Sequence, residues 1–494
     1  MARGAGILTK HIVAIDQGTT SSRAILFDEA GRPLTSDAHE FTQHYPDDGW
    51  VEHDPEDIWR DTVRAVKAVL TDETLAIGIT NQRETIVLWD RETGKPLHNA
   101  IVWQDRRTAD ACRQLKTDGH EAMISASTGL LLDPYFSATK LAWLLNHVDG
   151  ARAAADAGKL AAGTIDSFLL WRLTGDTVHA TDITNAGRTM LCDIHRGTWD
   201  GDLLELFNIP ESLLPRIAGN AEILGETDSS LFGRAIPIAG MAGDQQAALI
   251  GQACFEPGMV KSTYGTGCFL LLNTGTEAVA SKNRLLTTPA YKIGDEITYA
   301  LEGSIFVAGA AIKWLRDKLG VITDAAESEA IARAVPDNHG VTVVPAFTGL
   351  GAPHWEPDAR GLITGMTLDT TADHIVRATL ESIAFQTRDL LDAMTADGAA
   401  PPSAIRIDGG MAQNSWFAQF LSDVLATPVE RPESHETTAL GAAYLAGLAT
   451  GVWGDVADLS ARWEAAGRFE PAQDDAKRAT MLSKWQAALE RALP

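Results

Sequence analysis

Cysteine is scarce in this chain. The four cysteines among 494 residues are Cys112, Cys192, Cys254 and Cys268, and none of them shares the C-x-x-C spacing of a redox or zinc site. So few thiols exclude a disulfide-rich secreted scaffold and favour a reducing compartment. We expect these side chains to act mostly as small core residues.

Positive charge is also in short supply. Lys and Arg total 41 against 66 Asp and Glu, which gives a formal net charge of −25. A surface of that sign repels nucleic acid and anionic lipid, so neither is an expected partner. A phosphate-bearing ligand would have to be held by local backbone N–H groups and a metal ion instead of a broad basic surface.

Long apolar runs are missing as well. No stretch of 18 apolar residues occurs, and residues 1–16 lack the apolar segment of a signal peptide, so we expect a cytoplasmic protein without a membrane span. The composition is otherwise that of a globular protein, with 45% hydrophobic and 22% charged residues. Because 494 residues exceed what one core supports, two domains are expected.

Two similar turns rich in glycine and threonine lie about half the chain apart. The first, at 16–22, follows a β-branched apolar run, and the second, at 264–267, follows 257–263 and precedes another apolar run. Either turn alone is more simply explained as an ordinary hairpin. Together they predict two related domains, 1–253 and 254–494, whose turns supply backbone donors to a phosphate chain.

The first turn combines hydroxyl and charged side chains. Thr19, Thr20 and Ser21 offer O–H and N–H donors, and Arg23 carries a charge that can reach a phosphate. Asp16 stands at the end of the preceding strand, where a carboxylate can hold a water of hydrated Mg²⁺. The turn lacks the G-x-x-x-x-G-K-[ST] pattern, so it belongs to a different phosphate-binding fold.

A carboxylate opens a helical segment in the middle of the chain. Asp244 follows the glycine-rich residues 240–243 and precedes an apolar helical run. An Asp that caps a helix is common and contributes about 1 kcal/mol, so this role is the simpler interpretation of Asp244 alone. The functional alternative is a general base that removes the proton from an attacking hydroxyl.

A second strand-to-helix connection contains paired glycines. Residues 405–408 form an expected strand, Gly409 and Gly410 follow, and Asn414 precedes a helix with apolar residues at helical spacing. A plain connection is one interpretation. The paired glycines favour a second, in which an open platform accepts a nucleotide base and sugar.

Opposite charges stand side by side at the end of another expected strand. Arg83 and Glu84 either form a solvated turn pair or bind neighbouring hydroxyl groups, one donating and the other accepting. Trp103, Tyr135 and Phe269 lie in loop-like contexts. They are interpreted either as core residues or as the apolar wall that the carbons of a polyol require.

Ten segments together resemble the FGGY carbohydrate kinases, and within them the glycerol kinases. The likeness runs from about residue 11 to about 450. The segments are DQGTTSSRAILFD, GITNQRETIVLWD, IVWQDRR, GLLLDPYFSATKLAWLL, GTIDSFLLWRLTGD, GMAGDQQAALIGQ, STYGTGCFLLLNTG, EGSIFVAGAAIKWLRD, FTGLGAPHWEPDARG and DGGMAQNSWFAQFLSD.

The resemblance implies two actin-like, ribonuclease-H-like α/β domains flanking a cleft for ATP-Mg²⁺ and glycerol, with sn-glycerol 3-phosphate as product, in a homo-oligomer (dimer or tetramer). By position, the glycerol ligands are Arg83, Glu84, Tyr135, Asp244 and Gln245, with Trp103 and Phe269 as the apolar wall. The nucleotide contacts are Thr19, Thr20, Ser21, Arg23, Thr266, Gly309, Gly410 and Asn414. Asp244 matches the catalytic base and Asp16 the metal carboxylate.

The sequence departs from the family pattern at three positions. Lys313 stands where many relatives have glutamine near the nucleotide. Leu231 replaces a histidine that some bacterial relatives have phosphorylated, and Ala235, next to Arg234, replaces an arginine that others use to bind fructose 1,6-bisphosphate. We therefore expect neither form of control.

Two alternatives to a glycerol kinase remain. One is a kinase for another small sugar or polyol on the same fold. The other is a non-catalytic ATP-binding module, as the wider actin-like superfamily contains. Arg83, Glu84 and Asp244 argue against the module, because a switch needs no residues that bind a polyol.

Overall fold

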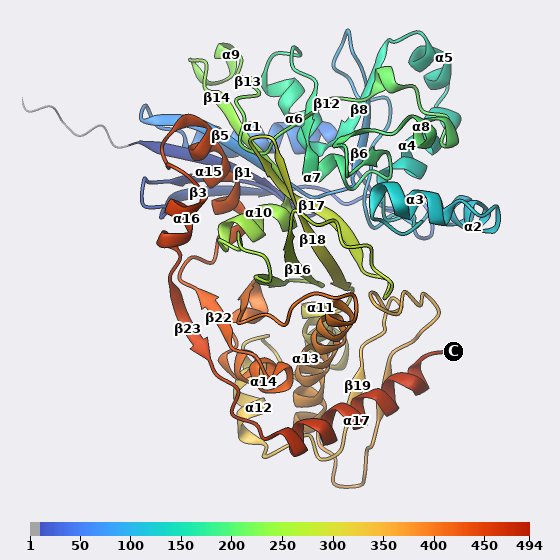
Figure 1. Cartoon of the computed structure of the whole chain (residues 1–494), viewed down its shortest axis with the longest axis vertical. Helices are drawn as coiled ribbons and strands as arrows, with labels where there is room; N and C mark the ends of the chain where they lie inside the picture. Colours follow the sequence, from blue (N-terminus) through green and yellow to red (C-terminus); the bar gives the residue numbers. More distant parts are fainter. Residues whose placement is uncertain (1–9) are drawn as a thin grey trace, which may run out of the picture.

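The computed structural model describes residues 10–494 and confirms a two-domain α/β fold, seen as an upper and a lower lobe in Figure 1. The first lobe is built on a six-stranded sheet in the order β13-β14-β5-β1-β2-β3. Its strands are β1 (His11–Gln17), β2 (Ser21–Phe27), β3 (Pro33–Glu40), β5 (Thr74–Asn81), β13 (Gly225–Glu226) and β14 (Pro237–Gly243). Residues 12–15 of β1 are fully buried, as expected of an apolar central strand.

The second lobe contains a seven-stranded sheet in the order β17-β18-β16-β15-β21-β22-β23. Its strands are β15 (Val260–Tyr264), β16 (Cys268–Gly275), β17 (Leu286–Ile293), β18 (Glu296–Ile305), β21 (Ile405–Asp408), β22 (Val429–Pro432) and β23 (Ala465–Phe469). In Figure 1, β16, β17 and β18 extend from the lower lobe toward the upper one.

The two sheets have the same central topology. The order β14-β5-β1-β2-β3 in the first corresponds to β22-β21-β15-β16-β18 in the second. In each sheet the first three strands of that series are parallel and the last three are antiparallel. Both glycine-threonine turns therefore join antiparallel strands at equivalent places, which confirms the related architecture expected from the sequence.

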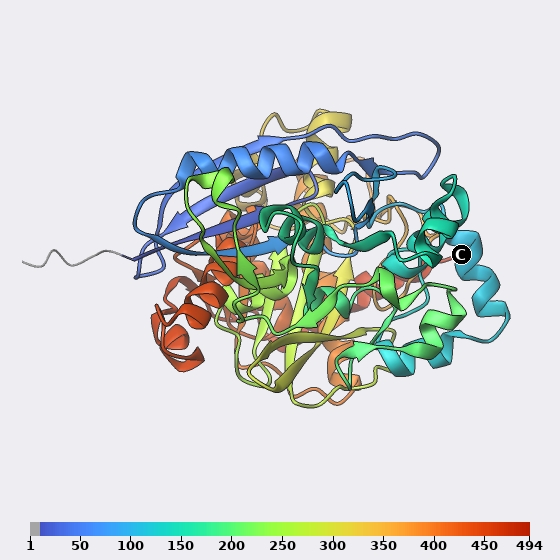
Figure 2. The same cartoon turned by 90° about the horizontal axis from the view of Figure 1, so that it is seen from above.

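Helices cover both faces of the first sheet. On one face lies α1 (Pro55–Val69), which begins with Pro55 in its first turn and with the Asp54 carboxylate accepting from the Glu56 amide at 2.9 Å. On the other lie α10 (Asp244–Gly251) and α15 (Thr437–Thr450). Figure 2 shows α1 along one side of the blue strands and the red helices away from it.

The helix α15 belongs to the second half of the chain but packs on the first sheet, and glycines permit its close approach. A Cβ added to Gly78 would lie 2.1 Å from the carbonyl oxygen of Ala442, and one added to Gly441 would lie 1.8 Å from that of Ala247. The division at residue 253 stays a prediction. The two sheets lie on opposite sides of it, whereas α15 packs across it.

A second layer of the first lobe is formed by β4, which precedes β5, and by elements between β5 and β14 in the chain. It contains a four-stranded sheet in the order β4-β7-β6-β8 and several helices. These elements are β4 (Glu52–His53), β6 (Ile86–Asp90), β7 (Ala100–Ile101), β8 (Leu160–Thr164), α2 (Ala109–Thr117), α3 (Glu121–Thr128), α4 (Ser137–His147), α5 (Ala151–Asp156), α6 (Ile165–Leu173) and α8 (Gly201–Leu206). Residues 151–160 are rich in alanine, which by helical propensity favours one continuous helix, but α5 ends at Asp156 and Leu160 already begins β8.

The remaining elements are short or belong to the helical layers of the second lobe. They are β9 (Ala180–Asp182), α7 (Ile183–Ala186), β10 (Cys192–Asp193), β11 (Thr198–Trp199), β12 (Arg216–Ala218), α9 (Ser229–Phe232), α11 (Gly309–Trp314), α12 (Glu327–Ala334), β19 (Thr342–Val344), β20 (Leu362–Thr364), α13 (Ala372–Ala396), α14 (Ser415–Leu425), α16 (Val456–Arg462) and α17 (Asp475–Ala492).

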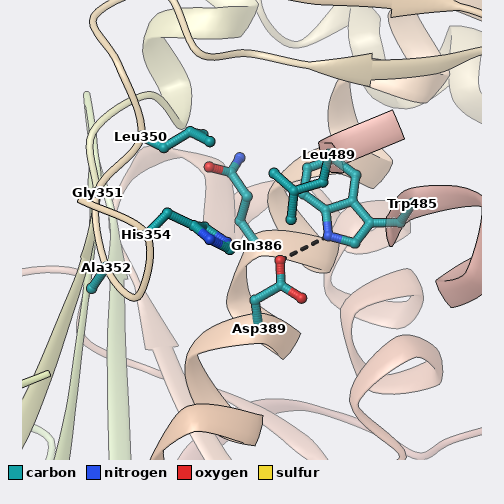
Figure 3. Close-up of a pocket in the computed structure, with 8 residues that line it drawn as sticks. All are labelled: Leu350, Gly351, Ala352, His354, Gln386, Asp389, Trp485 and Leu489. Atoms are coloured by element: carbon teal, nitrogen blue, oxygen red, sulfur yellow. Dashed lines mark hydrogen bonds between the residues drawn. The ribbon is translucent and has the colours of Figure 1, made fainter. Parts of the chain in front are cut away.

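The C-terminal helix α17 docks on α13 through a partly buried polar contact. The indole Nε1 of Trp485 donates to the Asp389 carboxylate at 2.8 Å, and the Gln486 amide donates to the same group at 3.0 Å. Asp389, Gln386 and His354 line a cavity of about 10 Å³, room for roughly one water molecule (Figure 3). Burial raises the pKa of Asp389 to about 7.

All four cysteines are free and buried in the structure. Burial raises the pKa of each thiol, for example to about 12 in Cys112 and Cys254. A raised pKa suppresses thiolate formation, so these cysteines are core residues, as the sequence indicated. Over residues 10–494, no helix has both the length and the apolar character needed to cross a membrane.

Candidate active site

The Arg83-Glu84 turn follows the carboxyl end of β5 and is buried. Arg83 is 2% exposed and Glu84 1%, which rules out the solvated turn pair. Glu84 adopts a left-handed backbone with φ of 60°, and its carbonyl accepts from the Ser137 hydroxyl at 2.8 Å. A non-glycine residue in this region costs about 1–3 kcal/mol and persists only where its surroundings enforce it.

Two residues that the sequence did not single out hold this turn. Glu302, on β18 of the second lobe, accepts from Arg83 Nη1 at 2.6 Å and from Nη2 at 2.9 Å. Arg188 of the first lobe donates from Nε to Glu84 at 2.6 Å and lies 3.2 Å from Glu302. Although burial opposes ionisation, the two arginines lower the pKa of Glu302 to about 2. Glu302 is therefore a carboxylate.

Asp244 lies beside this ion cluster as the first residue of α10. The N-cap position belongs to Gly243, and no side-chain capping bond is made there, so the capping role is wrong. The Asp244 carboxylate lies 3.3 Å from Arg83 Nε, and its side chain is 32% exposed. Burial raises its pKa, against the opposing charges of Arg83 and Lys261. A partly exposed carboxylate with a raised pKa suits proton transfer.

Three aromatic rings line the space beside Arg83. The Trp103 ring lies 5.6 Å from Tyr135 and 6.5 Å from Phe269, both edge to face. The Arg83 guanidinium lies 5.9 Å from the centre of the Phe269 ring. Phe269 belongs to β16, so its expected loop-like context is wrong: the register pairs it with Thr263 inside the second sheet. The predicted apolar wall is thus assembled from both lobes.

A buried lysine contacts the Gln245 side chain. Lys261, on β15, is fully buried and donates to Gln245 at 2.6 Å and to the Thr263 hydroxyl at 3.0 Å. Burial lowers its pKa, whereas Asp408 and Asp244 act in the opposite direction. This residue is not among those predicted from the sequence. Lys261 places a positive charge from the second lobe next to the predicted base.

The first glycine-threonine turn adjoins the aromatic wall. The Gly18 amide donates to Ser21 O at 2.9 Å and closes the turn, and the Thr19 hydroxyl accepts from Trp103 Nε1 at 3.0 Å. Thr20 is exposed at its tip. The turn expected to bind phosphate is therefore in direct contact with the wall expected to bind the polyol.

Arg23 and Asp16 are paired with each other. Arg23 Nη2 lies 2.6 Å from the Asp16 carboxylate and 2.7 Å from Glu436, the residue before α15. The two residues expected to meet a phosphate and a metal ion thus form one charged group at the end of β1. Asp16 is 16% exposed at its side chain. A single carboxylate beside hydroxyl groups fits a Mg²⁺ that keeps waters and takes its other ligands from a nucleotide.

The second lobe contains an open cavity of about 490 Å³ beside the second glycine-threonine turn. Four of the residues expected to contact nucleotide line it: Thr266, Gly309, Gly410 and Asn414. Lys313, the departure from the family pattern, lines it as well. The Asn414 side chain caps α14 by accepting from the Phe417 amide at 2.9 Å. Of the paired glycines Gly410 is open, whereas a Cβ added to Gly409 would lie 2.5 Å from the Tyr264 carbonyl oxygen. The other four expected nucleotide residues lie at the β1–β2 turn.

A signal for the missed charges does exist in the sequence. Glu302 directly follows the apolar residues 299–301 in β18, and Lys261 directly follows Val260 at the start of β15. A charge inside a buried strand must be paired, because its desolvation is costly. The sequence does not reveal which residue the partner is. For Glu302 the partner is Arg83, which lies 219 residues away in the chain.

Leu231 and Arg234, in the region where some relatives have their control sites, make structural contacts in this protein. The Arg234 guanidinium donates to the carbonyl oxygens of Thr71 at 3.0 Å and Thr74 at 2.7 Å. Leu231 packs against the core of the first lobe. Arg234 is therefore engaged by the backbone, and the loss of both control forms stays a prediction.

Comparisons with known proteins agree with this geometry. The pattern of the FGGY family of carbohydrate kinases, N-terminal domain, matches residues 11–251, and that of its C-terminal domain matches 260–450. A glycerol kinase of Gluconobacter oxydans is 59% identical, covering 98% of this chain and 95% of its own, and one of Rhodospirillum centenum is 58% identical, covering 97% of each.

Solved structures of carbohydrate kinases match this chain in fold. A Plasmodium falciparum glycerol kinase with ADP superimposes with a TM-score of 0.93 at 40% identity, covering 98% of this chain and 99% of its own. A xylulose kinase from Rhodospirillum rubrum reaches a TM-score of 0.85 at 24% identity, over 98% of each chain, and so supports the fold alone.

Proposed function

The chain belongs to the FGGY family of carbohydrate kinases, and we propose that it transfers the γ-phosphoryl group of ATP to glycerol, giving ADP and sn-glycerol 3-phosphate. The observation that carries the proposal is the buried Arg83-Glu84 turn, which faces the three aromatic rings beside the Asp244 carboxylate. A charged donor, a charged acceptor and an apolar wall together suit a molecule with hydroxyl groups on a short carbon chain.

Each residue has a part in this reaction. Arg83 donates to one hydroxyl of glycerol and Glu84 accepts from another, while Trp103 and Phe269 contact the carbon chain. Asp244 removes the proton of the attacking hydroxyl, whose oxygen forms a bond to the γ-phosphorus as the bond to the β-phosphate oxygen breaks.

Binding of the nucleotide is assigned to the second lobe and to the two turns. The 490 Å³ cavity accepts the base and ribose, with Gly309 and Gly410 allowing close approach of the backbone. The β1–β2 and β15–β16 turns then face the phosphates with backbone and hydroxyl donors. Asp16 would hold Mg²⁺ through its waters, and the ion when bound neutralises charge on the phosphates.

A substrate screen tests the proposal. ADP release from the purified protein is measured with glycerol, xylulose, ribulose, erythritol and dihydroxyacetone in turn. We expect glycerol to give the highest kcat/KM. Preference for another sugar or polyol would assign the chain to a different kinase of the same fold. ATP binding without turnover on any of the five would identify a non-catalytic module.

Two further properties are part of the proposal. We place the protein in the cytoplasm, which agrees with its four free, buried cysteines. We also propose a homo-oligomer, dimer or tetramer, as in the family it resembles. Light scattering on the eluted protein measures the mass directly, and a value of 52.9 kDa would mean a monomer.

A further inference from the structure

We propose that Glu302 and Arg188 are the positioning residues of the polyol site. In this arrangement a carboxylate from the second lobe orients Arg83, and a guanidinium from the first lobe orients Glu84. The proposal rests on the proposed function of Arg83 and Glu84 as glycerol ligands. Neither positioning residue needs to touch glycerol itself.

The hydrogen bonds of Arg83 fix its orientation toward Asp244 and Glu84. The Glu302 carboxylate accepts hydrogen bonds from both terminal nitrogens of Arg83, at 2.6 and 2.9 Å. This bidentate contact fixes the plane of the guanidinium. The Nε edge then faces the reaction side, 3.3 Å from Asp244 and 3.8 Å from Glu84. Without Glu302 the terminal nitrogens of Arg83 keep only a neutral partner, Gln246, whose Oε1 accepts from Nη1 at 3.2 Å in a single hydrogen bond that fixes the guanidinium plane less well.

Arg188 supplies the second half. Its Nε donates to Oε1 of Glu84 at 2.6 Å, which leaves Oε2 as the acceptor for a substrate hydroxyl. Its guanidinium also lies 5.5 Å from the Tyr135 ring and 3.2 Å from Glu302. Arg188 therefore contacts three parts of the site. Because Glu84 has the unfavourable φ of 60°, its side chain needs such an anchor to keep one orientation.

Glu302 is the carboxylate that two buried guanidinium groups share. It lies 2.6 Å from Arg83 Nη1 and 3.2 Å from Arg188 Nη2. Loss of the Glu302 charge removes this shared counter-ion from both arginines. The nearest remaining carboxylate for Arg83 is then Asp244, so Arg83 is drawn away from glycerol and toward the base.

The position of Glu302 makes the polyol site depend on both lobes. Glu302 is on β18 of the second sheet, whereas Arg83 and Arg188 belong to the first lobe. Glu302 is absent from the lining of the nucleotide cavity. A change at Glu302 is therefore expected to affect the KM for glycerol far more than the KM for ATP.

The test compares Glu302→Gln with Glu381→Gln. Glu381 is a matched control, because it is also a buried carboxylate, 2.9 Å from Arg377, but contacts no residue of the polyol site. For Glu302→Gln we expect the KM for glycerol to rise about 30-fold or more, because a charged hydrogen-bond pair is lost. The KM for ATP and the affinity for ADP, measured by calorimetry, should stay within about threefold. Glu302→Asp should recover part of the loss.

Arg188→Lys is the second variant and decides the outcome if Glu302→Gln does not fold. It keeps the buried charge but loses the directed Nε bond, so the KM for glycerol should rise about tenfold with little change in melting temperature. A lower melting temperature with an unchanged KM in both variants would overturn the proposal and leave a purely structural role. If the wild type phosphorylates another polyol, the proposed function fails, and the same KM comparison is made with that polyol.

Discussion

In the first lobe, the turn after β5 contains Arg83 and Glu84, whereas the turn after the equivalent strand β21 contains Gly409 and Gly410. The two strands hold the same place in two sheets of the same topology. One turn presents buried charges to a small space lined by aromatic rings, and the other leaves an open cavity of about 490 Å³. The scaffold is shared, so the proposed division into a polyol site and a nucleotide site lies in the residues at the strand ends.

The separation between the lobes is incomplete. Glu302, Lys261 and Phe269 belong to the second sheet, yet each contacts a residue of the polyol site. Conversely, Arg23 at the β1–β2 turn of the first lobe pairs with Glu436, which precedes α15 in the second half of the chain. The second lobe therefore contributes charge and packing to the site that the first lobe defines, and neither half of the molecule is a complete kinase.

The largest effect is expected from a substitution of Asp244, the proposed general base, in the first lobe. Asp244→Asn removes the group that accepts the proton of the attacking hydroxyl, so kcat should fall by about 10³-fold or more. Binding of ADP, measured by calorimetry, should remain close to that of the wild type, because Asp244 is outside the nucleotide cavity. Glycerol kinase activity within a few-fold of the wild type would defeat the assignment of Asp244 as base.

A smaller effect, on the nucleotide instead of the reacting hydroxyl, is expected from a glycine of the second lobe. A Cβ at Gly309 would lie 2.6 Å from the carbonyl oxygen of Gly265 in the β15–β16 turn. Gly309→Ala should displace that turn and raise the KM for ATP about tenfold or more, with the KM for glycerol little changed. Gly454→Ala is the matched control, since its added Cβ meets nothing within 4 Å. Equal changes in both KM values would mean that the two sites are not separable.

The smallest effect concerns a buried carboxylate that takes no part in the proposed chemistry. Both Asp244 and Asp389 have raised pKa values, but Asp389 lies under α17 in the second lobe (Figure 3). The folded protein retains the Asp389 proton up to about pH 7, whereas the unfolded chain releases it near pH 4. Its contribution to stability is therefore present at low pH and is lost as the pH rises through this window.

Asp389→Asn removes that dependence. At pH 8 the variant should melt about 1–3 °C above the wild type, and the difference should shrink at pH 5. Asp149→Asn, at an exposed position of the first lobe, serves as the control and should show no such trend. An equal shift at both pH values would show that Asp389 is ionised in the fold throughout. Glycerol kinase activity should be unchanged in either variant.

Much of the fold was predictable, because it follows from local patterns. The apolar run before each glycine-threonine turn indicated a strand, and β1 and β15 begin within these runs but extend to Gln17 and Tyr264, into the expected turns. Asp244 and the Gly409-Gly410 pair stood at recognisable strand-to-helix connections. The alanine-rich segment 151–160 was predicted less well, because helical propensity favoured a full helix where the sheet takes Leu160 into β8.

By itself, the sequence determined the two related halves, the residue types at the strand ends and the family to which the chain belongs. Only the tertiary structure showed that Glu302 holds Arg83 and that Lys261 contacts Gln245, pairs separated by 219 and 16 residues that lie in different lobes. A charge in an apolar strand indicates that a partner must exist, because desolvation is costly. Which partner it meets depends on how the two sheets and α15 pack together, and no local pattern records that packing.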